Sequence, residues 1–296
     1  MAGASGFLGQ ALAKELIAHR HLVHTLVRRP PRTGTELEWH PERAELDPAL
    51  LRGFAAVIGL SGAGISDKRW TAAYKRTLQE SRVQPTGTLA GALAALPEAD
   101  RPATFISASA IGYYGERGDQ PLPETATAGD GFLADLVVNW EGAAQPAVDA
   151  GVRVVTLRTG LVLSASGGLM KRLVPLFKLG LGGKLGSGQQ YQSWITLADE
   201  VAAIRHLLEA DQVNGPVNLV GPDPVRNAEF SSQLGKALHR PALLPAPAFG
   251  IRLVLGEFAD EGALASQRVL PEKLLASGYR FQHADLPAAL KWAIEN

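Results

Sequence analysis

Short apolar runs alternate with helical patterns along the first half of the chain. Four of these runs have the length and composition of buried strands, at residues 22–27, 52–60, 103–108 and 152–157. Residues 74–96 are long enough for a helix, in which Pro85 predicts a kink. Strands that alternate with helices need right-handed crossovers. The pattern therefore predicts an α/β fold built on a doubly wound parallel sheet.

The rhythm changes after residue 163, where glycine-rich loops interrupt it. A late strand at residues 215–221 is short enough to return to the edge of the sheet, and the chain beyond it is rich in proline and in helix-forming residues. We therefore predict a doubly wound domain over residues 1–163, joined by strand 215–221. A smaller mixed lobe, formed by residues 164–214 and 222–296, would cover a substrate.

Composition removes several classes of protein. Lys and Arg together number 29, as do Asp and Glu, so there is no net charge for general nucleic-acid binding. Cysteine is absent and the seven histidines are scattered, so we expect no metal site. No apolar stretch could span a bilayer, and the N-terminus lacks the pattern of a signal peptide. We predict a cytoplasmic protein without nucleic-acid or membrane partners, as a monomer or homodimer.

The strongest local motif opens the chain and reads Gly3-Ala4-Ser5-Gly6-Phe7-Leu8-Gly9, followed by a helical stripe and then a strand. Glycines at this spacing permit a tight turn, let backbone N–H groups approach a pyrophosphate, and let the helix pack closely on the sheet. An ordinary glycine-rich turn is the alternative. The position before a βα unit favours a Rossmann dinucleotide site that includes Gly3, Gly6 and Gly9.

The central strand of such a fold normally precedes the first glycine and has about five residues. Only Met1 and Ala2 stand there. We therefore expect either a natural start several residues upstream or an unusually abbreviated central strand.

Two arginines, Arg28 and Arg29, end the second predicted strand. An enzyme that uses NAD usually carries an acid there, about twenty residues after the glycines, for the ribose 2′-hydroxyl. A guanidinium can instead form a bidentate pair with a 2′-phosphate, so the pair predicts NADP as the cofactor. The alternative is a solvated Arg-Arg-Pro-Pro turn.

Several further segments recur in a recognisable order after the glycine motif. They are Leu60-Ser61-Gly62, Ser107 to Gly115, Phe132-Leu133-Ala134, Trp140-Glu141, Arg158-Thr159-Gly160, Ser193-Trp194-Ile195 and Gln267-Arg268-Val269-Leu270-Pro271. Together these segments resemble the extended and atypical short-chain dehydrogenase/reductases, in particular the group labelled "NAD-dependent epimerase family protein", whose C-terminal lobe has no assigned function. The resemblance covers nearly the whole chain.

The resemblance implies which residues contact the cofactor. It implies a pyrophosphate contact by the opening motif and a 2′-phosphate contact by the two arginines. The remaining positions would lie beside the adenosine or elsewhere along the nucleotide. For Arg82 the alternative is a surface helix cation, and Val162 combines core and cofactor-neighbour character. The full implied set is Gly3, Ser5, Gly6, Phe7, Leu8, Gly9, Arg28, Arg29, Leu60, Ser61, Gly62, Arg82, Ser107 and Val162.

Catalysis is where the sequence departs from the family it resembles. That family uses a Tyr as general acid/base with a Lys four residues later, and no such pair stands between Glu124 and Glu141. If Glu141 aligns with the acid that normally follows the pair, Leu133 and Val137 fill the Tyr and Lys places. Ser109 matches the serine that hydrogen-bonds the substrate, although a strand-end serine can also cap a turn. Tyr113 or Tyr114 could replace the missing acid, although adjacent tyrosines are often packing residues. Our catalytic candidates are these last three residues.

Two functions remain open. The first is an NADP(H)-dependent oxidoreductase or epimerase that acts on a small hydroxyl- or carbonyl-bearing substrate. The second is an NADP(H)-binding sensor or partner-binding module that has lost turnover. Because general acid/base assistance contributes roughly 10² to 10⁴ in rate, the missing Tyr-Lys pair handicaps the first without excluding it.

Overall fold

The computed structural model describes residues 1–296 and forms two compact units. Unit 1 comprises residues 1–109, 136–157 and 204–217, and unit 2 comprises residues 110–135, 158–203 and 218–296. These bounds differ from the predicted division at residue 163. The reason is visible in unit 2, where residues 121–122 pair in parallel with residues 268–269 and so join residues 110–135 to the C-terminal part of the chain.

Unit 1 contains the glycine motif and most of the main sheet. Its elements, three of which continue into unit 2, are α1 (Phe7–Ala18), β1 (Thr25–Val27), β2 (Glu36–Glu38), η1 (Pro41–Arg43), η2 (Pro48–Leu51), β3 (Ala56–Gly59), α2 (Ala72–Ala95), η3 (Glu98–Asp100), α3 (Phe132–Gly142), which begins in unit 2, α4 (Gln145–Asp149), and the strands β4 (Thr104–Ala110), β6 (Arg153–Thr159) and β10 (Gly215–Leu219). The strand order β10-β6-β4-β3 and the parallel pairs β3 with β4 and β1 with β2 give the predicted parallel sheet.

Two residues take the place of the central strand. The Ala2 N–H donates to the Ile58 carbonyl at 2.8 Å, and the Leu60 N–H donates to the Ala2 carbonyl at 3.1 Å. On the other side, the Leu26 N–H donates to the Met1 carbonyl at 2.8 Å. Met1 and Ala2 therefore join β1 to β3 as an abbreviated strand of the described chain.

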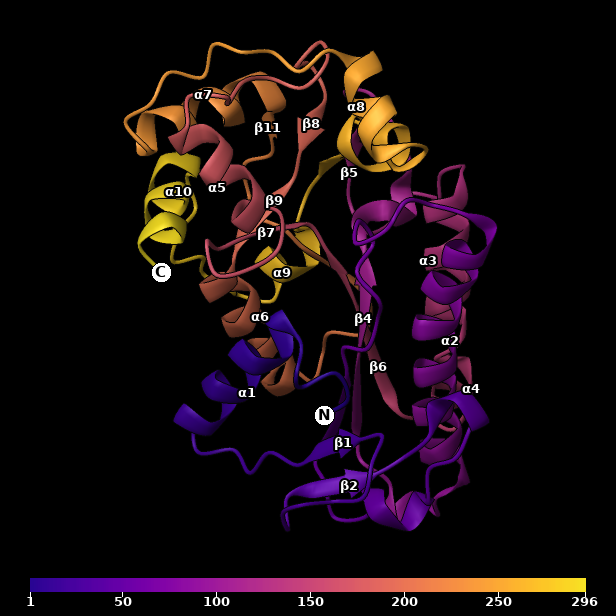
Figure 1. The fold of residues 1–296 in the computed structure, drawn as a ribbon. Coiled ribbons are helices and arrows are strands. Elements are labelled where there is room, and N and C mark those ends of the chain that lie inside the picture. Colours follow the sequence, from indigo (N-terminus) through magenta and orange to yellow (C-terminus); the bar gives the residue numbers. More distant parts are fainter. The chain divides into compact units, whose positions relative to one another are not determined.

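Helices cover both faces of the unit 1 sheet. Figure 1 shows α1 on one side of β4, and α2 and α4 on the other. Helix α2 begins at the N-cap Thr71, whose hydroxyl accepts a hydrogen bond from the Tyr74 N–H at 3.2 Å, and it continues through Pro85. Leu89, Leu93 and Phe105 are fully buried in the core between helix and sheet. The helix-and-strand alternation predicted from the sequence is confirmed, with β1 shorter than its apolar run.

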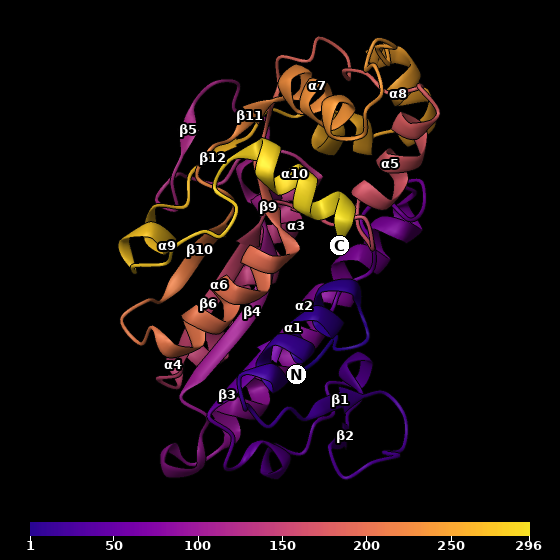
Figure 2. The same ribbon diagram turned by 90° about the vertical axis from the view of Figure 1, so that its left-hand side faces the viewer.

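Unit 2 is a mixed lobe of short strands and helices. Helix α10 packs against α7 in it (Figure 2), over a core that includes Trp194, Phe230 and Leu290. Its elements are η4 (Ile111–Tyr114), β5 (Pro121–Leu122), β7 (Leu161–Leu163), α5 (Met170–Lys178), β8 (Tyr191–Gln192), β9 (Trp194–Thr196), α6 (Leu197–Glu209), which continues into unit 1, β11 (Val225–Arg226), α7 (Asn227–Ala237), α8 (Ala248–Leu255), the π-helical η5 (Ala259–Ala263), β12 (Arg268–Val269), α9 (Glu272–Ala276) and α10 (Leu286–Glu295).

None of these helices combines the length and the apolar character that crossing a bilayer requires.

Candidate functional site

The opening motif forms a turn that only glycine can make at two positions. Gly3 has a φ of +75°, and a Cβ there would lie 2.7 Å from the carbonyl carbon of Leu60. A Cβ on Gly9 would lie 2.2 Å from the Gly3 carbonyl oxygen. Helix α1 then starts at the N-cap Gly6, which has no side chain to cap the first N–H groups. The turn therefore leaves backbone donors at a positive helix end, which suits a pyrophosphate.

The segment after β3 lies beside this turn and is held by Arg82. The Arg82 guanidinium donates from Nη2 to the Ala63 carbonyl at 2.9 Å and from Nη1 to the Leu78 carbonyl at 3.0 Å. Its Cζ lies 5.2 Å from the centre of the Trp140 ring, and burial lowers the pKa of Arg82 to about 10. Arg82 is thus a partly buried residue that fixes the loop carrying Leu60, Ser61 and Gly62.

The two arginines after β1 differ in their partners. Arg29 forms a bidentate pair with Glu36, with Nη1 2.8 Å from Oε2 and Nη2 2.7 Å from Oε1. The same carboxylate accepts from the Arg32 N–H, and the hydrogen bond from Arg29 is the main reason that the pKa of Glu36 falls to about 2. Arg28 is exposed and has no such partner. Of the two cations, Arg28 is the one open to an incoming anion.

Ser109 lies at the carboxyl end of β4 and is hydrogen-bonded to the carboxylate of Glu141. Its Oγ donates to Glu141 Oε1 at 2.6 Å, which joins the strand to α3 within unit 1. Ser109 is 5% exposed, and Ser107, two residues earlier, is fully buried and paired with Gly59 in the sheet. Because ligands of open α/β sheets bind beyond the carboxyl ends of the strands, the Ser109 and Glu141 side chains stand at the expected edge.

Tyr113 and Tyr114 belong to unit 2, and their environments differ. The Tyr114 hydroxyl donates to Asn218 Oδ1 at 2.7 Å and accepts from Arg158 Nη1 at 3.2 Å, and the residue is fully buried. Burial raises the pKa of Tyr114. Tyr113 is half-buried and lies edge-on to Tyr114, with its ring face 3.4 Å from Arg158 Cζ. The hydroxyl of Tyr114 is therefore committed to the interior.

A fully buried carboxyl lies near the end of β6 in unit 2. Glu200, on α6, accepts a hydrogen bond from Thr159 Oγ1 at 2.8 Å through Oε1, and its Oε2 has no partner. Burial raises the pKa of Glu200 to about 8, and the Thr159 hydroxyl only partly opposes this shift. Val162 lies two residues beyond Gly160, on β7, and pairs in parallel with Ile195 of β9.

The sequence interpretation missed the partners rather than the positions. Glu141 served only as a landmark in the Trp140-Glu141 segment, and Glu36 was not singled out. The sequence did hold a signal for the Arg29–Glu36 pair. The alternation Glu36-Leu37-Glu38 is typical of a short strand, and its first carboxylate lies only seven residues after Arg29. No cluster of three or more His, Asp or Glu side chains in the structure could hold a metal ion.

Comparison with known proteins gives the family. The model described as "NAD dependent epimerase/dehydratase family" matches residues 1–220. This chain belongs to that family. A second model, "Domain of unknown function (DUF1731)", matches residues 246–293, which lie in unit 2. The family and the doubly wound α/β fold predicted from the sequence are confirmed.

Individual relatives of this epimerase/dehydratase family member span almost its full length. It is 47% identical to "Epimerase family protein Mb2239" of Mycobacterium bovis over 99% of this chain and 96% of the relative. A solved structure of the human epimerase family protein SDR39U1 with NADPH is 34% identical, with a TM-score of 0.90 over 100% of this chain and 98% of that one. A nucleoside-diphosphate sugar epimerase from Corynebacterium glutamicum is 36% identical, with a TM-score of 0.80 over 99% of this chain and 57% of that one.

Proposed function

We propose that this chain is an NADP(H)-dependent oxidoreductase or epimerase-like enzyme that acts on a small hydroxyl- or carbonyl-bearing substrate. The glycine turn fits a dinucleotide, because Gly3 and Gly9 permit a tight turn that a Cβ at either position would block, and the turn presents uncapped backbone N–H groups at the start of α1. The exposed Arg28 supports a 2′-phosphate, as does the NADPH in the human relative's structure. The bound nucleotide would supply or accept the hydride.

The observation that carries the enzymatic part is the Ser109 hydrogen bond to Glu141 at 2.6 Å. Because Ser109 donates its only proton to the carboxylate, its lone pairs are left to accept a hydrogen bond from a substrate hydroxyl. When the alcohol is oxidised, Ser109 would take the hydroxyl proton and pass its own proton to Glu141. Reduction would run the same transfers in reverse. This pair would replace the acid/base function that Leu133 and Val137 cannot provide.

Among the tyrosines, the proposal keeps Tyr113 as a candidate proton donor and assigns Tyr114 to the interior of unit 2. The ring of Tyr113 rests on a buried cation, Arg158, while its own hydroxyl makes no hydrogen bond within the chain. The hydroxyl of Tyr114 already bonds Asn218 and Arg158.

A sensor without turnover is the second candidate. It is favoured by the apolar residues at the family's Tyr and Lys places, of which Val137 is 2% exposed. A cofactor-binding protein that has lost its proton donor would retain the glycine turn and Arg28 while losing catalysis.

The test separates nucleotide binding from turnover. Thermal shift and calorimetry with NADPH, NADP⁺ and NADH establish the cofactor, and absorbance at the nicotinamide band then follows NADPH with a carbonyl panel and NADP⁺ with an alcohol panel. Ser109→Ala and Glu141→Gln should each lower kcat by at least about tenfold while the Kd for NADPH stays nearly constant. Asp149→Asn, an exposed carboxylate on α4, is the control. Tight NADPH binding without turnover on either panel selects the sensor.

A further inference from the structure

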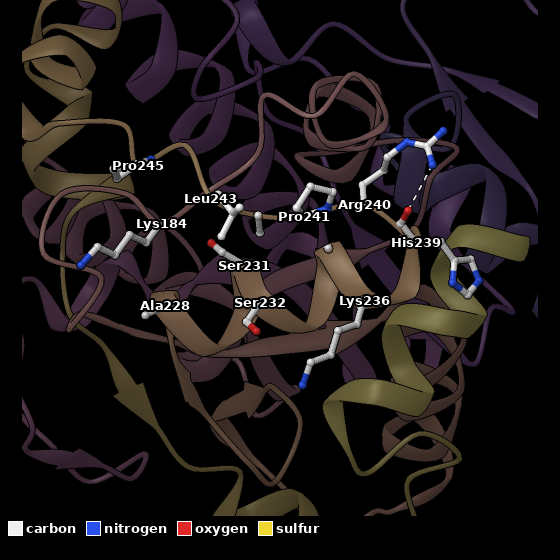
Figure 3. A pocket seen from close by; sticks show the side chains of 12 residues that line it. Lys184, Ala228, Ser231, Ser232, Lys236, His239, Arg240, Pro241, Leu243 and Pro245 are labelled. Carbon is white, nitrogen blue, oxygen red and sulfur yellow. Dashed lines mark hydrogen bonds between the residues drawn. The ribbon is translucent and has the colours of Figure 1, made fainter.

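Two hollows in the structure differ in how their walls are arranged. Figure 3 shows the groove along α7 in unit 2, where Lys184 lies beside the start of the helix and Lys236 and Arg240 lie at its other end. These cations point away from one another and surround no common point. The other hollow, of about 510 Å³, lies within unit 1, and apolar side chains from several elements line it. The walls of this second hollow converge on one kind of occupant.

The unit 1 hollow has the form of a slot between two strands, and it begins at the N-terminus, which Figure 1 shows beside β1. One wall is the segment that leads into β1, and the other is β3 with the residues before it. Helices α1 and α6 close one face of the slot, and η2, which belongs to the core beneath α2, closes the other. The residues that form these walls include Met1, Leu16, 22–26, Leu51, 53–58 and Leu208.

Met1 and Ala2 already bond the two walls in the pattern of a parallel strand. The Met1 amine donates to the His24 carbonyl at 2.7 Å, and the Leu26 N–H donates to the Met1 carbonyl at 2.8 Å. Ala2 forms the corresponding pair of bonds with β3, to which it runs parallel. Successive residues thus alternate between the two walls, as they do in the middle of a parallel sheet.

The walls repeat this pattern one step further from Met1. Shifting the Met1 bonds by two residues reaches the Leu22 carbonyl and the His24 N–H, and neither group forms a hydrogen bond within the chain. On the other wall, the Ile58 N–H points to the same side as the Ile58 carbonyl that bonds Ala2. An extended segment in the slot would therefore find backbone partners on both sides.

The terminal amine of Met1 lies where water reaches it poorly. Burial lowers the pKa of this amine to about 6, and its hydrogen bond goes to the His24 carbonyl. A charge held away from water costs free energy, whereas a peptide N–H at the same place would keep the hydrogen bond without the charge. A separate peptide would instead bring its own terminal carboxylate into the slot as a second buried charge. The amine therefore favours an occupant that is joined to Met1.

We propose that this slot holds an extended apolar segment, joined to Met1, that completes the sheet between β1 and β3. About four residues would bring Met1 and Ala2 to the usual length of a strand. Because the slot is closed on both faces, the side chains of the segment should be apolar throughout, with Val and Ile favoured. Ala2 leads directly into the turn at Gly3, so filling the slot should also hold that turn more rigidly. This last consequence alone rests on the proposed function, through the dinucleotide that the turn would bind.

The experiment compares three proteins that differ only before Met1, each released from the same cleavable fusion. They are the parent, a form extended by Ile-Val-Ile-Val and a form extended by Gly-Ser-Gly-Ser. Both extensions remove the buried charge, but only the first supplies apolar side chains that favour a strand. The apolar extension should raise Tm by at least about 5 °C, and the Gly-Ser extension should raise it less. Amide hydrogen exchange should show the His24 and Ile58 N–H groups protected by the apolar extension alone.

Equal gains from both extensions would mean that only the buried amine matters, and they would overturn the proposed strand. An apolar extension that changes neither Tm nor exchange at His24 and Ile58 would overturn it as well. Calorimetry with NADPH is a separate arm, in which the apolar extension should tighten binding by at least about threefold through the more rigid turn. A raised Tm with unchanged NADPH affinity would overturn the link to the turn. If no form binds NADPH, the proposed function fails, while Tm and hydrogen exchange still decide whether the slot holds a strand.

Discussion

The sheet edge of unit 1 and the buried Tyr114 network of unit 2 use their polar groups in opposite ways. In unit 1 the polar groups of interest stand at the sheet edge and keep bonding capacity open, as the N–H groups of the glycine turn, Arg28 and the lone pairs of Ser109 do. In unit 2, Arg158, Tyr114 and Asn218 are buried and bond one another. Polar groups that keep open capacity can bind a ligand, whereas mutually satisfied buried groups hold a fold together.

The largest effect should come from breaking the unit 2 network at Asn218. Its side chain accepts from Tyr114 and donates to the Leu122 and Leu270 carbonyls at 3.2 and 2.9 Å. Asn218→Ala leaves the Tyr114 hydroxyl and two backbone carbonyls without these partners, so we expect the free energy of unfolding to fall by about 4 kcal/mol. Urea unfolding measures this. Asn139→Ala, an exposed asparagine on α3, should change it by less than about 0.5 kcal/mol. Similar losses in both variants would remove the contrast between the units.

Glu200, a buried carboxyl of unit 2, should make the free energy of unfolding depend on pH. Its pKa of about 8 in the fold, against 4.5 in the unfolded chain, means that the folded protein binds the extra proton between those values. Stability from this group is therefore greatest below pH 4.5 and falls as pH rises to about 8. Glu200→Gln keeps the neutral shape and should raise the free energy of unfolding at pH 7 by about 3 kcal/mol relative to the parent. The gain should vanish near pH 4. A gain independent of pH would contradict the assigned titration.

The two arginines after β1 test whether a cation without an acid partner binds the cofactor more strongly than a paired one. Arg28→Ala should weaken NADP by about 2 kcal/mol and leave NAD nearly unchanged, because a charged hydrogen bond to the 2′-phosphate is lost. Arg29→Ala is the matched control, since its guanidinium already pairs with Glu36, and its effect on NADP should be smaller. Calorimetry with both nucleotides gives the four affinities. Equal affinity of the parent for NADP and NAD would reject the prediction of NADP, and a larger loss in Arg29→Ala would assign the 2′-phosphate to Arg29.

The smallest effect separates the two tyrosines. Tyr114→Phe removes the hydroxyl that bonds Asn218 and Arg158 and should lower the free energy of unfolding by about 1.5 kcal/mol. Tyr113→Phe removes a hydroxyl from a half-buried ring and should leave stability within about 0.5 kcal/mol. Thermal unfolding of both variants provides the measurement. A destabilised Tyr113→Phe would place its hydroxyl in the structural network and withdraw it as a candidate donor.

The sequence predicted what depends on neighbouring residues. The turn at Gly3 and Gly9 could be predicted because a tight turn and close helix packing require glycine at a fixed spacing. The run at residues 22–27 gave only β1 over Thr25–Val27, because only these residues pair with β2 over Glu36–Glu38, a partner that the apolar pattern did not predict. The bond between Tyr114 and Asn218 joins residues 104 positions apart, and that between Ser109 and Glu141 joins residues 32 apart. Such partners follow from tertiary packing, which no local pattern encodes.

The path of the chain bears on how the C-terminal segment could have been acquired or lost. Residues 246–293, which match the domain of unknown function, do not form a self-contained body. Strand β12 pairs with β5 from residues 121–122, and Glu261 accepts from the Leu133 N–H at 2.7 Å. A gene fragment encoding this segment alone would lack half of each of these pairings, so excision should give an unfolded peptide. The segment and residues 110–135 therefore belong to one structural unit whose parts lie far apart along the chain.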